Sequence, residues 1–372
     1  MTQMYPEVRD ATTLGPLFSQ ALFLPIAVEG QADGAGSATA AVPYEISRPS
    51  DSDTRFGASS SLGLLVKFLL ARGVPVVKAI ASKKGSAPSL PERQAAWAVL
   101  ESDQAVRIRL TDSVVQSDLV ALADSCENAD LINNKQIGFG GMAAATSAAN
   151  LITAAAAIAS KRFVLVGPAI IDENGVTLSG AFSAAAVAAE VAKNSDISDD
   201  LDTFPLPAFT GIEKDANGVP IFRVKVVAGS AVNDFETLLD GGVSPLRQGR
   251  NGGAEIAHLR MTYTTDTTMD ALMTRLIMDQ LFVDVRDYCE NNQFLRRGNT
   301  EETRNDLKAG VEALLTERSN WVTPITQPDG TPGYGVAVQA SADGRQVTIS
   351  YTGNIVRGIQ TILVDARLII AV

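Results

Sequence analysis

Apolar residues along the first half of the chain recur with two periods that alternate. Short apolar runs predict strands, and the stretches between them carry apolar residues three or four positions apart, which predicts helices. The predicted strands lie at 21–28, 41–46, 74–81, 106–110, 129–132 and 162–167. The predicted helices lie at 59–70, at 117–123, in the alanine-rich stretch that runs to Lys161, and at 182–193. Strands and helices that alternate in this way predict a layered α/β structure.

The pattern changes after Lys193. An acidic run at 195–202 and a proline-containing run at 204–211 predict a long surface connection, and 240–253 is rich in turn residues. Further strands are predicted at 222–229, 258–264 and 345–351, and the longest helix at 268–288.

Two polar pairs refine the helices of the second half. Arg275 and Asp279 are spaced as an i,i+4 ion pair on the polar side of the longest helix. Asn299 and Glu302 predict the start of one more helix.

Both ends of the chain carry apolar residues that need a partner. The first fourteen residues have too little apolar surface to bury alone, and the last run, 362–372, places apolar residues on one face of a strand. An apolar strand with an open edge pairs with whatever strand it meets. We therefore expect both ends to lie in contacts between subunits, through Tyr5, Val8, Leu14, Ile362, Val364, Leu368 and Ile370.

Composition narrows the classes of protein that this chain can be. Its 372 residues are 46% hydrophobic and 20% charged, which suits a globular protein of about two domains. A net charge of −11 disfavours a nucleic-acid partner, because such partners are held by basic residues that neutralise phosphates. The most membrane-like stretch, 140–158, is mostly alanine and favours a packed helix, so we expect no membrane insertion. With no signal-like run, Cys126 and Cys289 are expected to stay thiols in a reducing cytosol.

A search for catalytic and binding chemistry finds little. The single histidine, His258, has no nucleophile motif beside it, and we interpret it as a hydrogen-bonded strand residue rather than a base. The glycine-rich run 138–141 matches no phosphate-binding motif, and it favours a tight loop before a closely packed helix over a phosphate site. The carboxylates of Asp196, Asp199, Asp200 and Asp202 fit no calcium-loop spacing. We expect no catalytic, cofactor or metal site and therefore no enzyme.

The order of segments resembles the family of contractile-tail sheath proteins from bacteriophages and phage-like injection machines. The similar segments are YPEV at 5–8, RFG at 55–57 with the helix and strand after it, RFVLVGP at 162–168 with the small-residue helix after it, LLDGGVSPLRQGRNGG at 238–253, TYTTDTT at 262–268, WVTP at 321–324 and the closing strands 347–372. Together they span most of the chain.

The resemblance implies an α/β (α+β) fold in which both chain ends build an inner domain of mixed sheet and helices, with an outer α/β domain inserted. The implied parts are an N-terminal arm at 1–20, the outer domain at 21–253 and the inner assembly domain at 254–372 with an exchanged C-terminal strand. It also implies hexameric rings stacked helically around a tail tube, in contact with baseplate and tail terminator proteins. Such a sheath is assembled in the bacterial cytoplasm and resides in a virion tail or an injection machine.

In such a sheath the exchanged strands would serve as hinges during contraction. Residues that absorb dihedral change cheaply flank both chain ends, namely Gly15, Gly353, Asn354 and Gly358. Two other classes remain open from the sequence. One is another self-assembling subunit, of a tail tube or a shell, and the other is a cytosolic α/β enzyme that uses the glycine-rich run.

Overall fold

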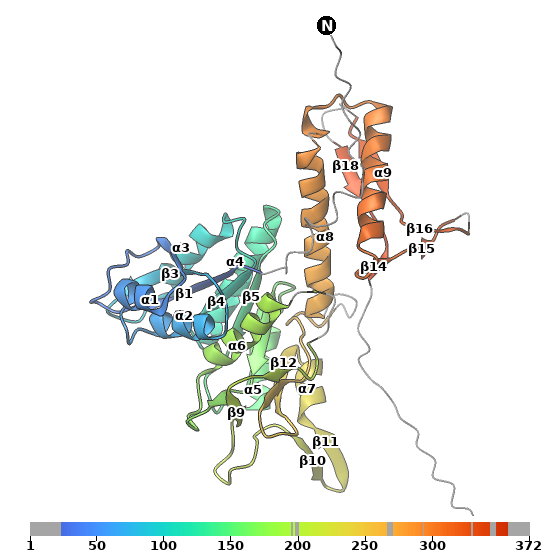
Figure 1. The fold of residues 1–372 in the computed structure, drawn as a ribbon. Coiled ribbons are helices and arrows are strands. Elements are labelled where there is room, and N and C mark those ends of the chain that lie inside the picture. Colours follow the sequence, from blue (N-terminus) through green and yellow to red (C-terminus); the bar gives the residue numbers. More distant parts are fainter. Residues whose placement is uncertain are drawn as a thin grey trace, which may run out of the picture.

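A computed structural model describes residues 24–194, 196–197, 201–265, 271–292, 294–328, 330–342 and 347–355. Within them, a nine-stranded mixed sheet forms the centre of an α/β body (Figure 1). The adjacent parallel strands are β3, β1, β4, β5, β6 and β12, and antiparallel strands flank them at both edges. The order across the sheet is β2 (Pro43–Ile46), β3 (Val77–Lys84), β1 (Ile26–Ala32), β4 (Ile108–Thr111), β5 (Ile137–Gly141), β6 (Phe163–Gly167), β12 (Val243–Gln248), β13 (Ala254–Ile256) and β8 (Pro205–Leu206).

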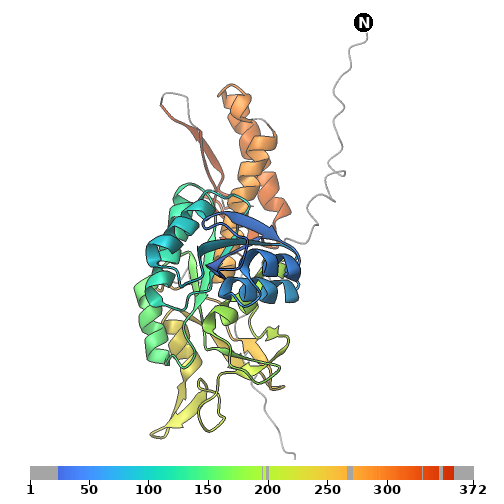
Figure 2. The same cartoon turned by 90° about the vertical axis from the view of Figure 1, so that its left-hand side faces the viewer.

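Helices cover both faces of the sheet, which gives three layers (Figure 2). One face carries α1 (Pro49–Phe56), α2 (Ser61–Ala71) and α6 (Gly180–Lys193), and the other carries α3 (Leu90–Glu101), α4 (Gln116–Leu131), α5 (Ala148–Ile158) and α7 (Asp234–Asp240). Successive strand residues point to opposite layers. On β1, Ile26 and Val28 pack into the core beneath α2 and α6, whereas Ala27 packs into a small cluster with α3. The predicted α/β layering is therefore confirmed.

Local sequence signals fix several helix ends. The Ser60 side chain accepts a hydrogen bond from the backbone amide of Gly63 at 2.9 Å and so caps α2. Just beyond the end of α2, Gly73 adopts φ +84°, which favours glycine. The helix α3, which the sequence reading missed, begins with a capping box formed by Ser89 and Glu92.

The second half of the chain adds a pair of long helices beside the body. The helix α8 (Leu272–Asn291) extends away from the sheet, and α9 (Glu301–Glu317) runs back alongside α8 (Figure 1). A short 3₁₀ turn, η2 (Phe294–Arg296), lies between them. The two-stranded sheets that follow pair β14 (Val322–Thr323) with β19 (Asn354–Ile355), β15 (Ile325–Thr326) with β16 (Pro332–Gly333), and β17 (Ala337–Ala340) with β18 (Val347–Ser350).

Two more antiparallel pairs complete the α/β body. The strands β7 (Ile170–Asp172) and β9 (Phe209–Ile212) pair beside the carboxyl end of β6. The hairpin of β10 (Val224–Val227) and β11 (Ser230–Asn233) projects from the end of the body away from α8 (Figure 1).

Several predicted elements need correction. Residues 129–132, predicted as a strand, belong to the end of α4 and the turn after it, because the helical spacing of Leu119, Leu122, Cys126 and Ala129 continues to that point. Residues 138–141, predicted as a loop, form most of β5 in the middle of the sheet. The strand predicted at 21–28 begins at Ile26, after Pro25, and continues to Ala32.

The region 240–264 was also misread. Its turn-rich first part contains β12, a strand buried between β6 and β13. The strand predicted at 258–264 forms no ladder and makes only an isolated bridge between Arg260 and Ala271. Instead, the backbone amides of Thr262 and Tyr263 donate hydrogen bonds to the carbonyls of Phe163 and Ser160, at 2.9 and 3.2 Å. This segment is therefore hydrogen-bonded to the start of β6 without forming a strand of the sheet.

Candidate functional sites and assembly surfaces

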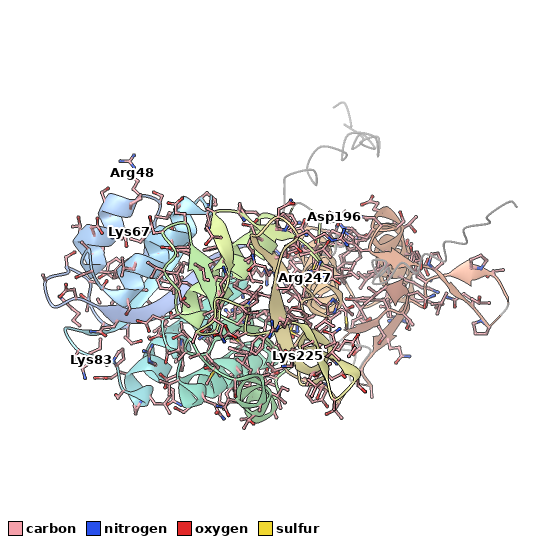
Figure 3. All side chains as sticks on the ribbon, turned by 90° about the horizontal axis from the view of Figure 1, so that it is seen from below. Arg48, Lys67, Lys83, Asp196, Lys225 and Arg247 are labelled. Atoms are coloured by element: carbon pink, nitrogen blue, oxygen red, sulfur yellow. The ribbon has the colours of Figure 1, made fainter. Side chains whose placement is uncertain are left out.

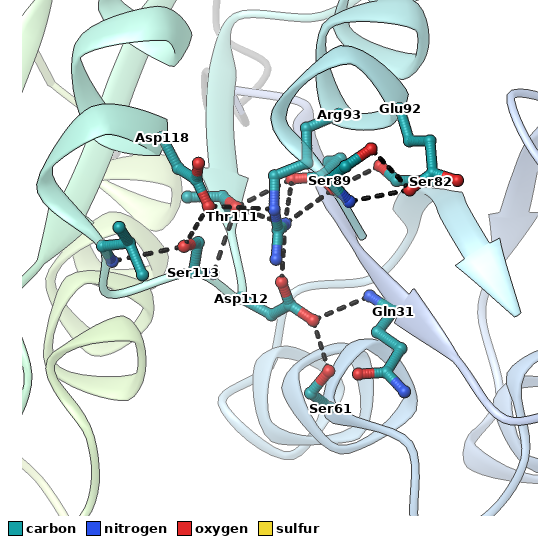
Figure 4. Close-up of polar contacts among 12 residues, drawn as sticks. Gln31, Ser61, Ser82, Ser89, Glu92, Arg93, Thr111, Asp112, Ser113 and Asp118 are labelled. Carbon is teal, nitrogen blue, oxygen red and sulfur yellow. Dashed lines mark hydrogen bonds and ion pairs between the residues drawn. The ribbon is translucent and has the colours of Figure 1, made fainter. Parts of the chain in front are cut away.

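The carboxyl edge of the sheet between β1 and β4 is where an α/β protein of this topology would hold a ligand. The chain adds β3 on one side of β1 and β4 on the other, so its winding direction reverses there, and ligands bind at such switch points. In this protein the place is filled by its own side chains (Figure 4). The residues converge from β1, β3, β4, α3, α4 and the start of α2.

One guanidinium organises this switch-point network. Arg93 Nη1 donates to both carboxylate oxygens of Glu29, at 2.8 and 2.9 Å, and to Asp112 Oδ1 at 2.8 Å. Arg93 Nε lies 3.1 Å from Asp118 Oδ2. The hydroxyls of Ser82 and Thr111 also donate to Glu29, the second at 2.7 Å. Arginine and its three carboxylates are thus bound to one another.

Burial has a marked effect on one member of the network. Glu29 is fully buried, and this burial raises the pKa of its carboxyl to about 7, although Arg93 acts in the opposite direction. A carboxyl with a raised pKa can serve as a proton donor in an enzyme. Here its oxygens are occupied by protein donors, so the arrangement stiffens the edge of the sheet and leaves Glu29 out of contact with solvent.

The glycines of 138–141 serve close packing. A Cβ atom on Gly138 or Gly140 would lie 2.7 Å from the Phe163 ring. On Gly141 it would lie 2.2 Å from the carbonyl oxygen of Gly180, at the start of α6. The run therefore lets β5 approach β6 and α6 more closely than side chains would allow. The expected close packing is present, but on a strand rather than in a loop.

The residues with candidate polar chemistry have protein partners. His258 Nδ1 lies 2.7 Å from Asp202 Oδ2, which agrees with a hydrogen-bonded histidine. Asp196 accepts hydrogen bonds from Trp321 Nε1 at 2.8 Å and Asn320 Nδ2 at 3.0 Å. Figure 3 shows Asp196 where the body meets the second half of the chain. Asp199 and Asp200 lie outside the described residues. In the described ranges, no group of three or more histidine, cysteine or acidic residues is arranged to hold a metal ion.

Cys126 and Cys289 are both free thiols, and burial raises the pKa of Cys126 to about 11. Such a thiol stays protonated and is a poor nucleophile. Among the described helices, none combines the length and apolar character that a membrane span requires.

An open hollow of about 520 Å³ lies beside the β10–β11 hairpin. The residues that line it include the start of α5, the side chains of Ile221 and Phe222, and charged residues of both signs. Lys214 and Lys225 share the hollow with Glu213, Asp215 and Asp234. This mixture selects neither an anionic nor a cationic ligand.

An ion-pair cluster around a buried guanidinium joins α8 to the α/β body, and we call it the α8 joint. It comprises Arg162, Asp130 and Asp279. Arg162, at the start of β6, binds Asp279 of α8 through Nη1 and Asp130 of α4 through Nη2, the latter at 2.7 Å. The Arg162 side chain is 1% exposed. The sequence placed Asp279 in a surface pair with Arg275, but Asp279 is buried and its ion pair is with Arg162.

Two small hairpins present strand edges that could accept another strand. In the β17–β18 pair most residues are exposed, and α9 packs beside β17. The β10–β11 pair exposes Val224, Val226 and Val227 at 60%, 76% and 49%. Two-stranded sheets of this length have little stability of their own. Both are therefore candidate contact surfaces.

The described residues include only part of the predicted interface and hinge set. Tyr5, Val8, Leu14, Gly15, Gly358, Ile362, Val364, Leu368 and Ile370 lie outside them. Gly353 and Asn354 lie at the β14–β19 pair, where a Cβ on Gly353 would come within 2.4 Å of Val322 Cγ2. Close packing is thus a second reason for glycine at position 353, and its hinge role stays a prediction.

Sequence reasoning missed the residues that organise both clusters. Their partners are far away in the chain, so spacing could not reveal them: Arg162 meets Asp279 across 117 positions. A weak signal did exist. Glu29 and Arg162 are charges inside or directly before apolar strands, and such charges are usually paired when buried.

Comparison with known proteins gives a consistent result for structure. No protein-family model matches the sequence, and no curated protein is significantly similar to it. Among solved structures, it is similar to the helical sheath of the anti-feeding prophage in its contracted state, with a TM-score of 0.66, 12% identity and coverage of 94% of each chain. A sheath tail protein from Desulfitobacterium hafniense matches with a TM-score of 0.64 and 9% identity over 91% of this chain and 98% of that one.

A third match is the sheath complex of an extracellular contractile injection system in its contracted state. Its TM-score is 0.66 at 12% identity, and the match covers 99% of this chain and 98% of the other. Identities this low establish the fold alone. The chain therefore has the fold of the contractile sheath proteins over nearly its whole length.

Proposed function

We propose that this chain is the subunit of a contractile sheath, a structural polymer around a tail tube that shortens to drive the tube through a target envelope. The observation that carries the proposal is the near-full-length likeness to sheath chains from three different contractile systems. A second observation supports it. The switch point at which an α/β enzyme of this topology would bind a ligand is filled by the Arg93 network.

The domain organisation of the proposal follows the two parts of the fold. We assign 21–253 to an outer domain, and 254–372 together with the arm 1–20 to an inner assembly domain. The border that we assign lies directly before β13, which still pairs with β12 in the nine-stranded sheet, so the sheet itself continues to Ile256. The α8–α9 helices and the small two-stranded sheets then form the described portion of the inner domain.

Strand exchange would link the copies. In this proposal the terminal segments of neighbouring copies add to the open edges of the small sheets, which satisfies backbone donors and acceptors across subunits. A head-to-tail contact that does not close on itself generates a helical array, here of stacked hexameric rings. The tube, the baseplate and the tail terminator would be the other partners, as the sheath fold implies. One similar structure comes from an anti-feeding prophage baseplate, with a TM-score of 0.69.

Polymer formation by the pure, full-length chain tests the proposal. We expect the protein to pellet on ultracentrifugation and to form hollow helical tubes in negative-stain electron microscopy, at least when its cognate tube protein is present. Calorimetry with ATP or NAD should show no saturable binding. A chain that stays monomeric with the tube protein, or that binds a nucleotide stoichiometrically, would support the enzyme alternative instead.

A further inference from the structure

The helix α8 belongs to both parts of the molecule. Its first half packs against the α/β body at the α8 joint, where Asp279 meets Arg162. Lys135, in the turn before β5, lies over the Phe282 ring of α8 at 4.4 Å. The second half packs against α9 and the turn after it, where Arg318 Nη2 binds Asp284 at 2.8 Å. One continuous helix thus contacts both the α/β body and the α9 region.

The α8 joint resists independent motion of α8 because the Arg162–Asp279 pair is buried and Arg162 is shared with the half-buried Asp130. The side chains of Arg162 and Asp279 are 1% and 11% exposed. One guanidinium holds carboxylates from two helices, Asp130 on α4 and Asp279 on α8. Sliding α8 relative to the sheet would separate a buried ion pair and leave both charges uncompensated, which is strongly unfavourable.

The chain after β18 packs against the same core as α8. Tyr351 directly follows β18 and packs against the core that contains α8 residues. Burial raises the pKa of its phenol to about 12, and the negative charges of Asp279 and Asp284 act in the same direction. The predicted hinge residues Gly353 and Asn354 come immediately afterwards.

We propose that the α8 joint is a mechanical lock that makes the α/β body and α8 one rigid lever, so that movement of the C-terminal segment is transmitted to the whole outer domain. This rests on the proposed function, because the lever acts only in a polymer whose copies pull on one another. Motion then concentrates beyond Tyr351. Rigid elements that move about a few residues at their ends are a general form of conformational change.

Two full-length variants distinguish the effect of breaking the buried ion pair from the effect of removing an exposed charge from the same helix. Asp279→Asn removes the buried charge, and Asp287→Asn, whose side chain is 51% exposed, is the matched control. In the unassembled protein, Asp279→Asn should speed amide exchange in the first half of α8 by about tenfold or more, because the lock that resists local opening is lost. Exchange in α6, a buried helix of the body, should stay unchanged in both variants.

A second variant of the α8 joint provides the test if Asp279→Asn does not fold. Arg162→Lys keeps the charge but cannot hold two carboxylates in the same planar geometry, so it should give the same localised increase in exchange at a smaller size. If both variants exchange like Asp287→Asn, the lock does not exist.

The second measurement is made on assembled tubes. With the lock lost, we expect contraction to become incomplete, with body and α8 in variable relative positions by electron microscopy. Uniform and complete contraction in a variant with a loosened α8 would overturn the role of the joint as a lever. If the unaltered chain forms no tubes, the proposed function fails together with the lever, while the exchange data still decide whether the joint is rigid.

Discussion

In the middle of β1, the protonation state of the Glu29 carboxyl is coupled to folding. Its pKa is about 7 in the folded protein against an ordinary 4.5. A raised folded pKa means that the folded protein holds a proton which the unfolded chain releases above pH 4.5. The associated stability is fully present below about pH 4.5 and is lost as the pH rises through about 7.

This linkage gives the first prediction. Between pH 4.5 and 8, the unaltered protein should lose on the order of 3 kcal/mol of unfolding free energy through Glu29. Glu29→Gln should lack this contribution, because its amide does not titrate. Urea unfolding of both proteins at pH 5 and pH 8 measures the difference. Glu312→Gln, at a side chain that is 42% exposed, serves as control. A pH dependence that Glu29→Gln leaves unaltered would contradict a role of Glu29 in it.

The second prediction concerns the close approach of β5 and α6. Gly141→Ala would place a Cβ 2.2 Å from the Gly180 carbonyl oxygen, and backbone on both sides leaves no flexible side chain to yield. We expect a loss of about 1–3 kcal/mol or more in unfolding free energy. Gly298→Ala is the matched control, because its Cβ would meet nothing closer than 3.9 Å. Equal stability of the two variants would show that glycine at 141 is not required by packing.

The buried charges also show where prediction from residues stops. Sequence patterns predict that charged residues lie on the surface, and the i,i+4 spacing alone predicted an ion pair between Asp279 and Arg275. The actual partner, Arg162, is brought into place only when β6 and α8 have packed together. Tertiary contacts between distant residues are therefore beyond the reach of periodicity, even where the helix itself is predicted correctly.

For helices and strands, the spacing of apolar residues and the length of each apolar run determined which predictions were correct. Strands with clear apolar runs, such as β3 and β6, and helices with an apolar stripe, such as α2 and α6, are confirmed. The strands β5 and β12 were missed because glycine and proline in them mimic turns. Gly138 and Gly140 instead make room for the Phe163 ring. Pro245 lies in a buried strand, and its carbonyl accepts a hydrogen bond from the backbone amide of Ala257.

The packing of α8 on α9 gives the third prediction. Gly310 of α9 faces Tyr288 of α8, and a Cβ at position 310 would lie 1.8 Å from the Tyr288 hydroxyl and 2.2 Å from its Cζ. Gly310→Ala should therefore push the two helices apart and destabilise them by about 1–3 kcal/mol. In the double variant Gly310→Ala with Tyr288→Leu, part of that loss should return. Amide exchange along α9 provides the measurement, and no recovery in the double variant would rule out this contact as the cause.

For the molecule as a whole, the predicted α/β class and the predicted likeness to sheath proteins are both confirmed, whereas the covering of both sheet faces by helices was not predicted. What the sequence could not place is the angle at which α8 leaves the body, since that depends on the joint between Arg162 and Asp279. The predicted interface residues at both chain ends stay predictions, because they lie outside the described residues.

We propose that copies of this chain polymerise by exchanging terminal strands. Deleting residues 360–372 tests it most directly, because Ile362, Val364, Leu368 and Ile370 are removed together. Burying such side chains is worth roughly 1.5–3 kcal/mol each, enough to decide whether a contact between copies forms. Circular dichroism and thermal unfolding establish that the shortened protein keeps its α/β body.

Electron microscopy of the full-length and shortened proteins, side by side at equal concentration and with the tube protein present, is the deciding measurement. We expect long helical tubes from the full-length chain and only isolated or briefly associated subunits from the shortened one. Long tubes of unchanged helical order from the shortened chain would contradict strand exchange at this end.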